Sequence, residues 1–67
     1  MLSARNQFPG KIKSVKLGNV MAEVVTEVGA MELVSVITRH SAEQMGLKVG
    51  DTVTAVIKST EVLVSKG

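Results

Sequence analysis

The 67-residue chain has no cysteine, no tryptophan and no tyrosine, and its single histidine is His40. The lack of cysteine excludes a disulfide framework, and with one histidine a zinc site is not expected. These absences matter because a domain this small buries only about 60% of its unfolded surface. Such domains usually need a disulfide, a metal or a partner chain for stability. Of these three ways to stabilise a small domain, the composition leaves oligomerisation.

Aromatic side chains are almost absent too, since Phe8 is the only one. The bases of RNA and of single-stranded DNA bind largely by stacking on aromatic rings, so this composition disfavours a barrel that binds them. Eight Lys and Arg residues against six Asp and Glu residues give a formal charge of +2, and the basic residues are spread along the chain. We therefore expect no nucleic-acid partner, although a small anion would suit this charge.

The chain also lacks a membrane-spanning run of about eighteen apolar residues and the basic and apolar regions of a leader peptide. We expect a cytoplasmic protein with no membrane contact. No nucleophile–base pair can be built around His40, which we expect at the surface. No pair of carboxylates suggests acid–base chemistry, and no phosphate-binding loop or dinucleotide fingerprint is present. The sequence thus predicts a protein that is not an enzyme.

What the chain does contain is β-branched residues, with twelve valines and three isoleucines. Glycines divide these β-branched residues into runs of strand length. The pairs Gly18-Asn19 and Gly29-Ala30 are typical of two-residue hairpin turns. Ser41 and Gln44 have capping-box spacing, and Gly46 is a natural helix end. We expect one domain over residues 1–67, with strands at 8–17, 20–28, 31–38, 52–58 and 60–65 and a helix at about 40–45. This outline indicates an all-β, five-stranded barrel of the oligonucleotide/oligosaccharide-binding type, with the helix between the third and fourth strands.

The phase of the apolar residues adds two predictions. Ile12 has the opposite parity to Val15, so a β-bulge is expected near Ser14, where the strand would curve around the barrel. In the third strand Val34 and Val36 point away from the other apolar residues, so both faces are apolar. Such a strand is either central or covered by a second subunit. Because a barrel this small cannot cover both faces itself, we expect a second subunit.

Donors suited to an anion stand near the ends of the predicted elements. Two lie at the start of the short helix, whose free N–H groups favour anions. Taken singly, each donor has an ordinary role as a surface residue, a helix cap or an edge-strand charge. Together they supply two cations, several hydroxyls and no carboxylate, which suits a compact tetrahedral dianion. The set is Ser3, Arg5, Thr38, Ser41, Lys58 and Ser59.

The chain contains the segments "SARNQ", "GKI", "VMAEVV", "VITRHSAEQMGLKVGD" and "TAVIKSTEVLV". Together they resemble the molybdenum–pterin-binding family, also called molbindin or Mop, which contains the molybdate-binding TOBE-type domain. The resemblance extends from Ser3 to Val64, and the combination of "SARNQ" with "TAVIKST" at this distance is specific. One departure is "QFPG", because Pro9 lacks an N–H and must lie at a strand end or an edge.

This resemblance implies a homohexamer, a trimer of dimers, in which the N-terminal strand is exchanged between subunits. It implies that molybdate or tungstate binds between subunits for intracellular molybdenum storage and homeostasis, with no catalytic cofactor and no metal other than the oxyanion. Carried over by position, the site comprises Ser3, Arg5, Lys58 and Ser59, with the backbone N–H of Ala4. Thr38 and Ser41 of a neighbouring subunit complete it.

A second hypothesis stays open at this stage. "MGLKVGDTVTAVIK" also resembles the swapped-hairpin barrels of bacterial transition-state regulators, which bind DNA. Against this hypothesis, the basic residues do not cluster, and "SARNQ" has no role in that fold.

Overall fold

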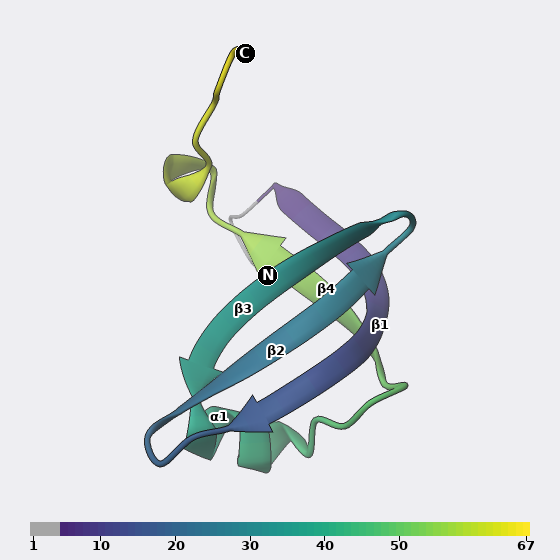
Figure 1. Ribbon diagram of the computed structural model, residues 1–67, viewed down its shortest axis with the longest axis vertical. Helices are drawn as coiled ribbons and strands as arrows, with labels where there is room; N and C mark the ends of the chain where they lie inside the picture. Colours follow the sequence, from purple (N-terminus) through teal and green to yellow (C-terminus); the bar gives the residue numbers. More distant parts are fainter. Residues whose placement is uncertain (1–4) are drawn as a thin grey trace.

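The computed structural model describes residues 5–67 and contains one antiparallel sheet of four strands with a short helix beneath it (Figure 1). The order of strands across the sheet is β3-β2-β1-β4, so β3 and β4 are its two edges. The elements are β1 (Asn6–Leu17), β2 (Met21–Val28), β3 (Met31–Thr38), α1 (Arg39–Met45), β4 (Thr52–Ile57) and a 3₁₀ turn, η1 (Ser59–Glu61).

The long strand β1 holds the sheet together because it pairs with two neighbours. Its first half pairs with β4, from Asn6 opposite Ile57 onward, and its second half pairs with β2. The register with β2 shifts between Ile12 and Ser14, which confirms the predicted bulge. A bulge bends and twists a strand, so β1 can serve both halves of a curved sheet.

The turns lie at the glycines, as predicted, except that the first hairpin turn is shifted by one residue. Gly29 takes a positive φ of 58° between β2 and β3, as a two-residue hairpin requires. At the first hairpin the N–H of Gly18 donates to the carbonyl of Met21 at 2.8 Å, and β2 begins at Met21. The two turn residues there are therefore Asn19 and Val20, one position later than predicted. Helix α1 ends at Gly46 with φ 62°, which confirms the predicted stop.

The buried core is small. Only four apolar side chains are buried among the described residues, and none of the large ones is fully enclosed. A cavity of about 220 Å³ lies beside them, lined by side chains of all four strands and by Met45 and Leu47. The four buried apolar residues are Ile12, Ala22, Val24 and Ala42.

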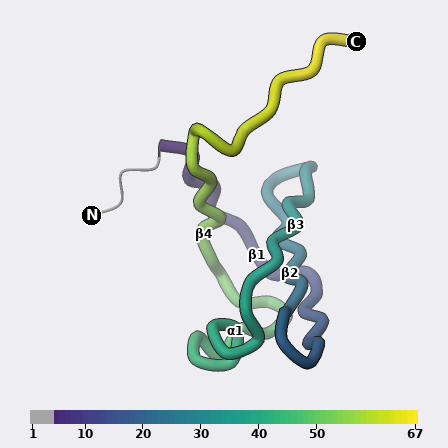
Figure 2. The backbone as a smooth tube through the Cα atoms, turned by 90° about the vertical axis from the view of Figure 1, so that its left-hand side faces the viewer, coloured from purple at the N-terminus to yellow at the C-terminus, as the bar shows by residue number. Residues whose placement is uncertain are grey.

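The predicted fifth strand over 60–65 is not formed in this chain. Residues 59–61 form η1, and the segment from 62 to 67, called the tail below, has no regular structure and runs away from the sheet (Figure 2). Leu63 and Val64 are 93% and 94% exposed. A strand exists only beside a partner that accepts its hydrogen bonds, and no strand within residues 5–67 pairs with the tail.

Exchange of the N-terminal strand between subunits stays a prediction. Within the single chain, β1 pairs with β2 and β4 along its described length. Pro9 lies within β1 opposite Thr54, in the half of the strand that pairs with β4, while pairing with β2 starts at Lys11. The proline thus occupies a stretch where one side of β1 is open, as its missing N–H requires.

Gly10 is required by a close approach between strands. A Cβ on this residue would lie 2.4 Å from the Glu27 carbonyl oxygen and 2.9 Å from a Val28 methyl group. We expect Gly10→Ala to lower the free energy of unfolding by about 1–3 kcal/mol, as overpacking does. Urea unfolding followed by circular dichroism measures this change. Gly67→Ala is the control, because nothing lies within 4 Å of its added methyl group; equal stability of both variants would contradict the prediction.

Candidate oxyanion site

The pairing of β1 with β4 brings together the basic residues of the predicted site. Asn6 lies opposite Ile57 in an antiparallel ladder, so Arg5, just before Asn6, and Lys58, just after Ile57, share one end of it. Both side chains are exposed, as is Ser59. Arg5, Lys58 and Ser59 are called the basic half-site below.

The turn η1 fixes the backbone beside the basic half-site. The N–H of Glu61 donates to the Lys58 carbonyl at 2.9 Å, and the N–H of Val62 donates to the Ser59 carbonyl at 3.4 Å. The same turn carries Glu61, a carboxylate that the sequence reasoning left out of the site. Its place three residues after Lys58 in "KSTE" was the available signal. Glu61 is exposed, so water and salt screen its repulsion of an anion.

Thr38 and Ser41 meet at the start of α1. Thr38 is the N-cap, with its Oγ1 accepting from the Ser41 N–H at 3.1 Å and donating to Ser41 Oγ at 2.8 Å. The predicted cap was Ser41; Thr38 takes this role because it is the last residue in extended conformation, φ −69° and ψ 146°. The Ser41 hydroxyl, which accepts from Thr38, keeps its own proton to donate outward. Thr38 and Ser41 are called the hydroxyl half-site below.

Arg39 anchors the hydroxyl half-site to the first hairpin. Its backbone N–H donates to the Val20 carbonyl at 2.7 Å, and its guanidinium donates to the Gly18 carbonyl at 3.2 Å. The guanidinium also lies 3.5 Å from the carboxylate of Glu43, one helical turn on. Arg39 is therefore engaged within the fold, and it sets the position of Thr38 and Ser41 rather than extending the cationic part of the site.

The two half-sites lie at opposite ends of the fold. In Figures 1 and 2 α1 is at the bottom, whereas the end of β4 that leads into η1 is at the other side of the sheet. The structure thus brings Arg5, Lys58 and Ser59 together, and separately Thr38 with Ser41, but it does not bring the two groups to each other within one chain. Ser3 and Ala4 lie outside the described residues.

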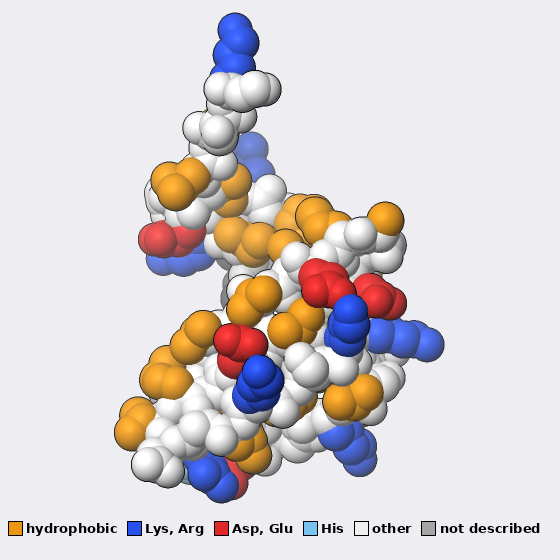
Figure 3. Space-filling model, in the orientation of Figure 1, with side chains coloured by type: hydrophobic (Ala, Val, Ile, Leu, Met, Phe, Trp, Pro, Cys, Tyr) orange, Lys and Arg blue, Asp and Glu red, His pale blue; other side chains and the backbone are white. Residues whose placement is uncertain are grey.

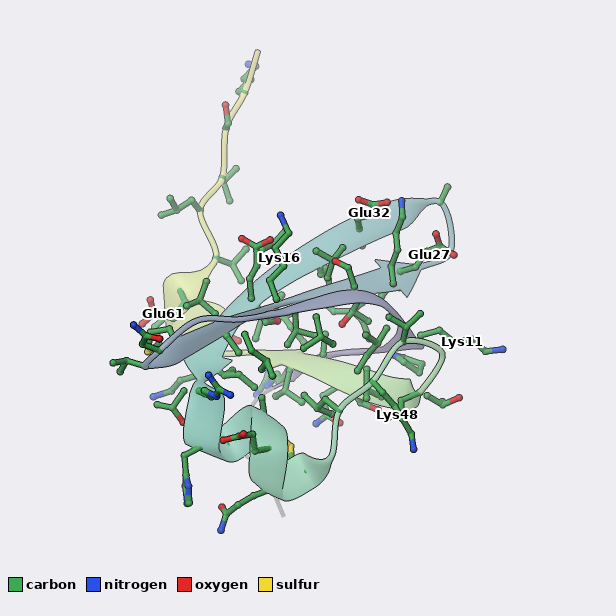
Figure 4. The ribbon with its side chains drawn as sticks, turned by 60° about the horizontal axis from the view of Figure 1, so that its bottom comes forward. Lys11, Lys16, Glu27, Glu32, Lys48 and Glu61 are labelled. Atoms are coloured by element: carbon green, nitrogen blue, oxygen red, sulfur yellow. The ribbon has the colours of Figure 1, made fainter. Side chains whose placement is uncertain are left out.

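The remaining charges are concentrated on the outer face of the sheet, the face away from α1. Figure 4 places Glu27, Glu32 and Lys16 on this side of the sheet. Glu27 and Glu32 are directly opposite each other, which is unfavourable for like charges. Lys13 compensates by pairing with Glu32, and this hydrogen bond, with the nearby negative charge, raises the pKa of Lys13. His40 is exposed in the first turn of α1, as predicted.

A family model, a curated relative and a solved structure each match nearly the whole chain. A family model described as the TOBE domain matches residues 2–64. Molybdenum-pterin-binding protein 3 of Clostridium pasteurianum is 50% identical over 64 residues, which are 94% of each chain. A molybdate-binding protein from Sporomusa ovata has a structure that superimposes with a TM-score of 0.95 at 39% identity, over 98% of both chains.

A third relative is longer than this chain. The cytoplasmic molybdate-binding protein ModG, solved with molybdate bound, matches with a TM-score of 0.84 at 38% identity. The match covers 88% of this chain but 43% of ModG. The relatives are thus named as binding proteins. Within residues 5–67, no helix has the length and apolar character needed to cross a membrane.

Proposed function

Because the chain belongs to the TOBE-domain family, and within it to the molybdenum-pterin-binding proteins, we propose that it binds molybdate at contacts between subunits. The observation that carries the proposal is the pairing of Asn6 with Ile57, which gathers Arg5 and Lys58 at one end of the β1–β4 ladder. Two cations at the same end of one strand ladder suit a doubly charged anion. Relatives of nearly equal length and fold are named for the same ligand.

The site acts by binding without turnover. The basic half-site of one chain provides charge-assisted hydrogen bonds, with Ser3 and the Ala4 N–H in the same proposed shell, and these replace the hydration of the anion. The hydroxyl half-site of a neighbouring chain completes the shell. There the Thr38 hydroxyl donates to Ser41, which polarises the Ser41 hydroxyl and makes it a better donor to the oxyanion.

A shell made of donors also gives selectivity against protonated anions. Hydrogen phosphate carries an O–H, and the side chains of the proposed shell offer it hydroxyl oxygens rather than a carboxylate as acceptors. Its proton also weakens the charge-assisted hydrogen bonds from Arg5 and Lys58. Tungstate has the shape and charge of molybdate, so it is expected to bind as well. We propose storage and homeostasis of cytoplasmic molybdenum as the role, in line with the cytoplasmic relative and with the absence of any candidate catalytic pair in the sequence.

The assembly that we propose is a homohexamer, a trimer of dimers, completed by exchange of chain ends. The segment that we propose for this exchange is the tail rather than β1, because β1 is already paired with β2 and β4, whereas no strand within residues 5–67 pairs with the tail. Strands β3 and β4 are both edges of the sheet, and both contribute to the lining of the cavity. The apolar residues Val62, Leu63 and Val64 of a second copy would cover that cavity and take up the open edges.

Calorimetric titration tests the function directly. Protein of known oligomeric state is titrated with molybdate, tungstate, sulfate and phosphate. We expect heat and saturation with molybdate and tungstate, and much weaker binding of phosphate. No heat with molybdate at micromolar protein would overturn the proposal. A steep salt dependence of DNA retention would instead favour the DNA-binding hypothesis, since phosphate contacts release counterions.

A further inference from the structure

Acidic side chains of this fold lie beside basic groups that belong to neither half-site, with one exception. On the face that Figure 3 shows, each group of acidic side chains adjoins basic ones. Five of the six carboxylates have such a partner, and the pairs are Glu23 opposite Lys16, Glu27 opposite Lys11, Glu32 with Lys13, Glu43 with Arg39, and Asp51 with the backbone N–H of Lys48. The sixth carboxylate is Glu61.

Glu61 lies next to the cations of the basic half-site instead. Its N–H donates to the Lys58 carbonyl at 2.9 Å, and residues joined in this way by one turn have Cα atoms less than about 7 Å apart. Arg5 shares the end of the β1–β4 ladder with Lys58. Figure 4 places Glu61 at η1, well apart from Lys11 and Lys48. Glu61 is therefore the carboxylate placed to act on the cations assigned to the ion.

This carboxylate acts through its charge rather than through a contact. Within residues 5–67 the Glu61 side chain forms no ion pair, and both Glu61 and Lys58 are exposed. The screening length at physiological salt is about 8 Å, so the charge of Glu61 still reaches across the turn. Arg5 and Lys58 give the half-site two positive charges, and Glu61 reduces the net charge to one. A dianion that the two cations would neutralise is thus repelled in part.

We propose that Glu61 sets the affinity of the oxyanion site: it holds the affinity below what Arg5 and Lys58 alone would give, and it serves as their counterion when the site is empty. This inference rests on the proposed function and names how that site is regulated. A charge that is taken from water without a partner is costly. With Glu61 beside the two cations, the ion leaves without exposing them to that cost, so uptake remains reversible.

Two signatures separate this role from a purely structural one. The energy of two charges is proportional to their product, so a dianion feels about twice the repulsion that a monoanion feels. Removal of the Glu61 charge must therefore favour molybdate more than it favours a singly charged anion. Salt screens charges that are exposed to solvent, so the effect of Glu61 must also shrink as the salt concentration rises.

The first test removes the charge and keeps the shape of the side chain. Glu61→Gln is expected to bind molybdate about threefold to tenfold more tightly than the wild type at low salt, and the difference should diminish at high salt. Calorimetric titration measures both affinities. Glu61→Asp retains the charge and should remove most of the difference. Glu27→Gln is the matched control, because Glu27 is exposed and lies in β2, outside both half-sites; its affinity should resemble that of the wild type.

A second measurement needs no oxyanion. Sedimentation velocity of the ion-free protein at low salt is expected to show less assembled protein for Glu61→Gln than for the wild type, because the cations of the basic half-site then face a neighbouring chain without a counterion. Added salt should restore the assembly. In this comparison too, Glu27→Gln is expected to behave as the wild type.

The outcomes that would overturn the inference are distinct from a failure of the proposed function. Unchanged or weaker molybdate binding by a folded Glu61→Gln variant would overturn it, as would an equal gain in Glu27→Gln. If the wild type takes up no molybdate, the proposed function fails, and the ion-free comparison still decides whether Glu61 neutralises the half-site. Equal assembly of the ion-free Glu61→Gln and wild-type proteins would then rule out that role.

Discussion

Lys58→Ala is expected to weaken molybdate binding by about 1.5–3 kcal/mol, the contribution of a hydrogen bond to a charged group. This corresponds to a loss of roughly tenfold to 150-fold in affinity. Arg5→Ala should have a similar effect, because the β1–β4 ladder places both cations at one end. Calorimetric titration of each folded variant with molybdate measures the loss.

A lysine elsewhere on the chain provides the control for this prediction. Lys48 is exposed in the loop after α1, so Lys48→Ala removes the same charge without touching either half-site. Its affinity for molybdate should stay within about twofold of the wild type, since exposed charges at a distance are screened by salt. If Lys58→Ala and Arg5→Ala both bound molybdate like the wild type, the residues assigned to the site would be wrong even though the family is right.

The second large effect is expected from shortening the chain after Glu61. Removal of residues 62–67 deletes three exposed apolar side chains, each of which contributes about 1.5–3 kcal/mol when it becomes buried. The shortened chain should keep its four-stranded sheet, because the tail pairs with none of the strands that the structure describes. It should fail to assemble, and with the site split between chains it should also lose molybdate binding.

Sedimentation velocity measures this loss of assembly, and circular dichroism checks that the sheet persists. A chain that lacks only residues 65–67 is the control, since it retains Val62, Leu63 and Val64 and should assemble normally. An assembled, molybdate-binding protein without residues 62–67 would rule out the tail as the exchanged segment. Loss of the β-sheet signal on shortening would show that the tail supports its own chain instead.

Local patterns in the sequence predicted most of the sheet. The parity change between Ile12 and Val15 located the bulge to within a residue, because a period of two leaves no other way to bury both side chains. Gly46 located the helix end, because its positive φ is costly for other residues. The opposite faces of Leu33 and Val34 also followed from alternation, and the structure confirms them.

The failures have one physical cause, which is dependence on a partner. A run such as "EVLVS" has the composition of a strand, yet strand structure requires a neighbour, and the described part of the chain does not offer one to residues 60–65. The candidate site also depends on a partner, because the resemblance assigns Thr38 and Ser41 to a neighbouring subunit. The topology accordingly places Thr38 and Lys58 at opposite ends of the fold, and the assignment of both residues to one ion stays a prediction.

The separation of the two half-sites has a consequence for stoichiometry. A chain with a different docking surface at each end can close with a second copy, each chain supplying its basic half-site to the other as in the dimers of the proposed hexamer, or it can continue head to tail as an open filament. In a closed assembly every chain contributes one basic end and receives one, so the number of these ions equals the number of chains. An open filament would leave one half-site without a partner at each tip. The ratio of bound ions to chains would therefore be below one, and it would fall further as the filaments became shorter.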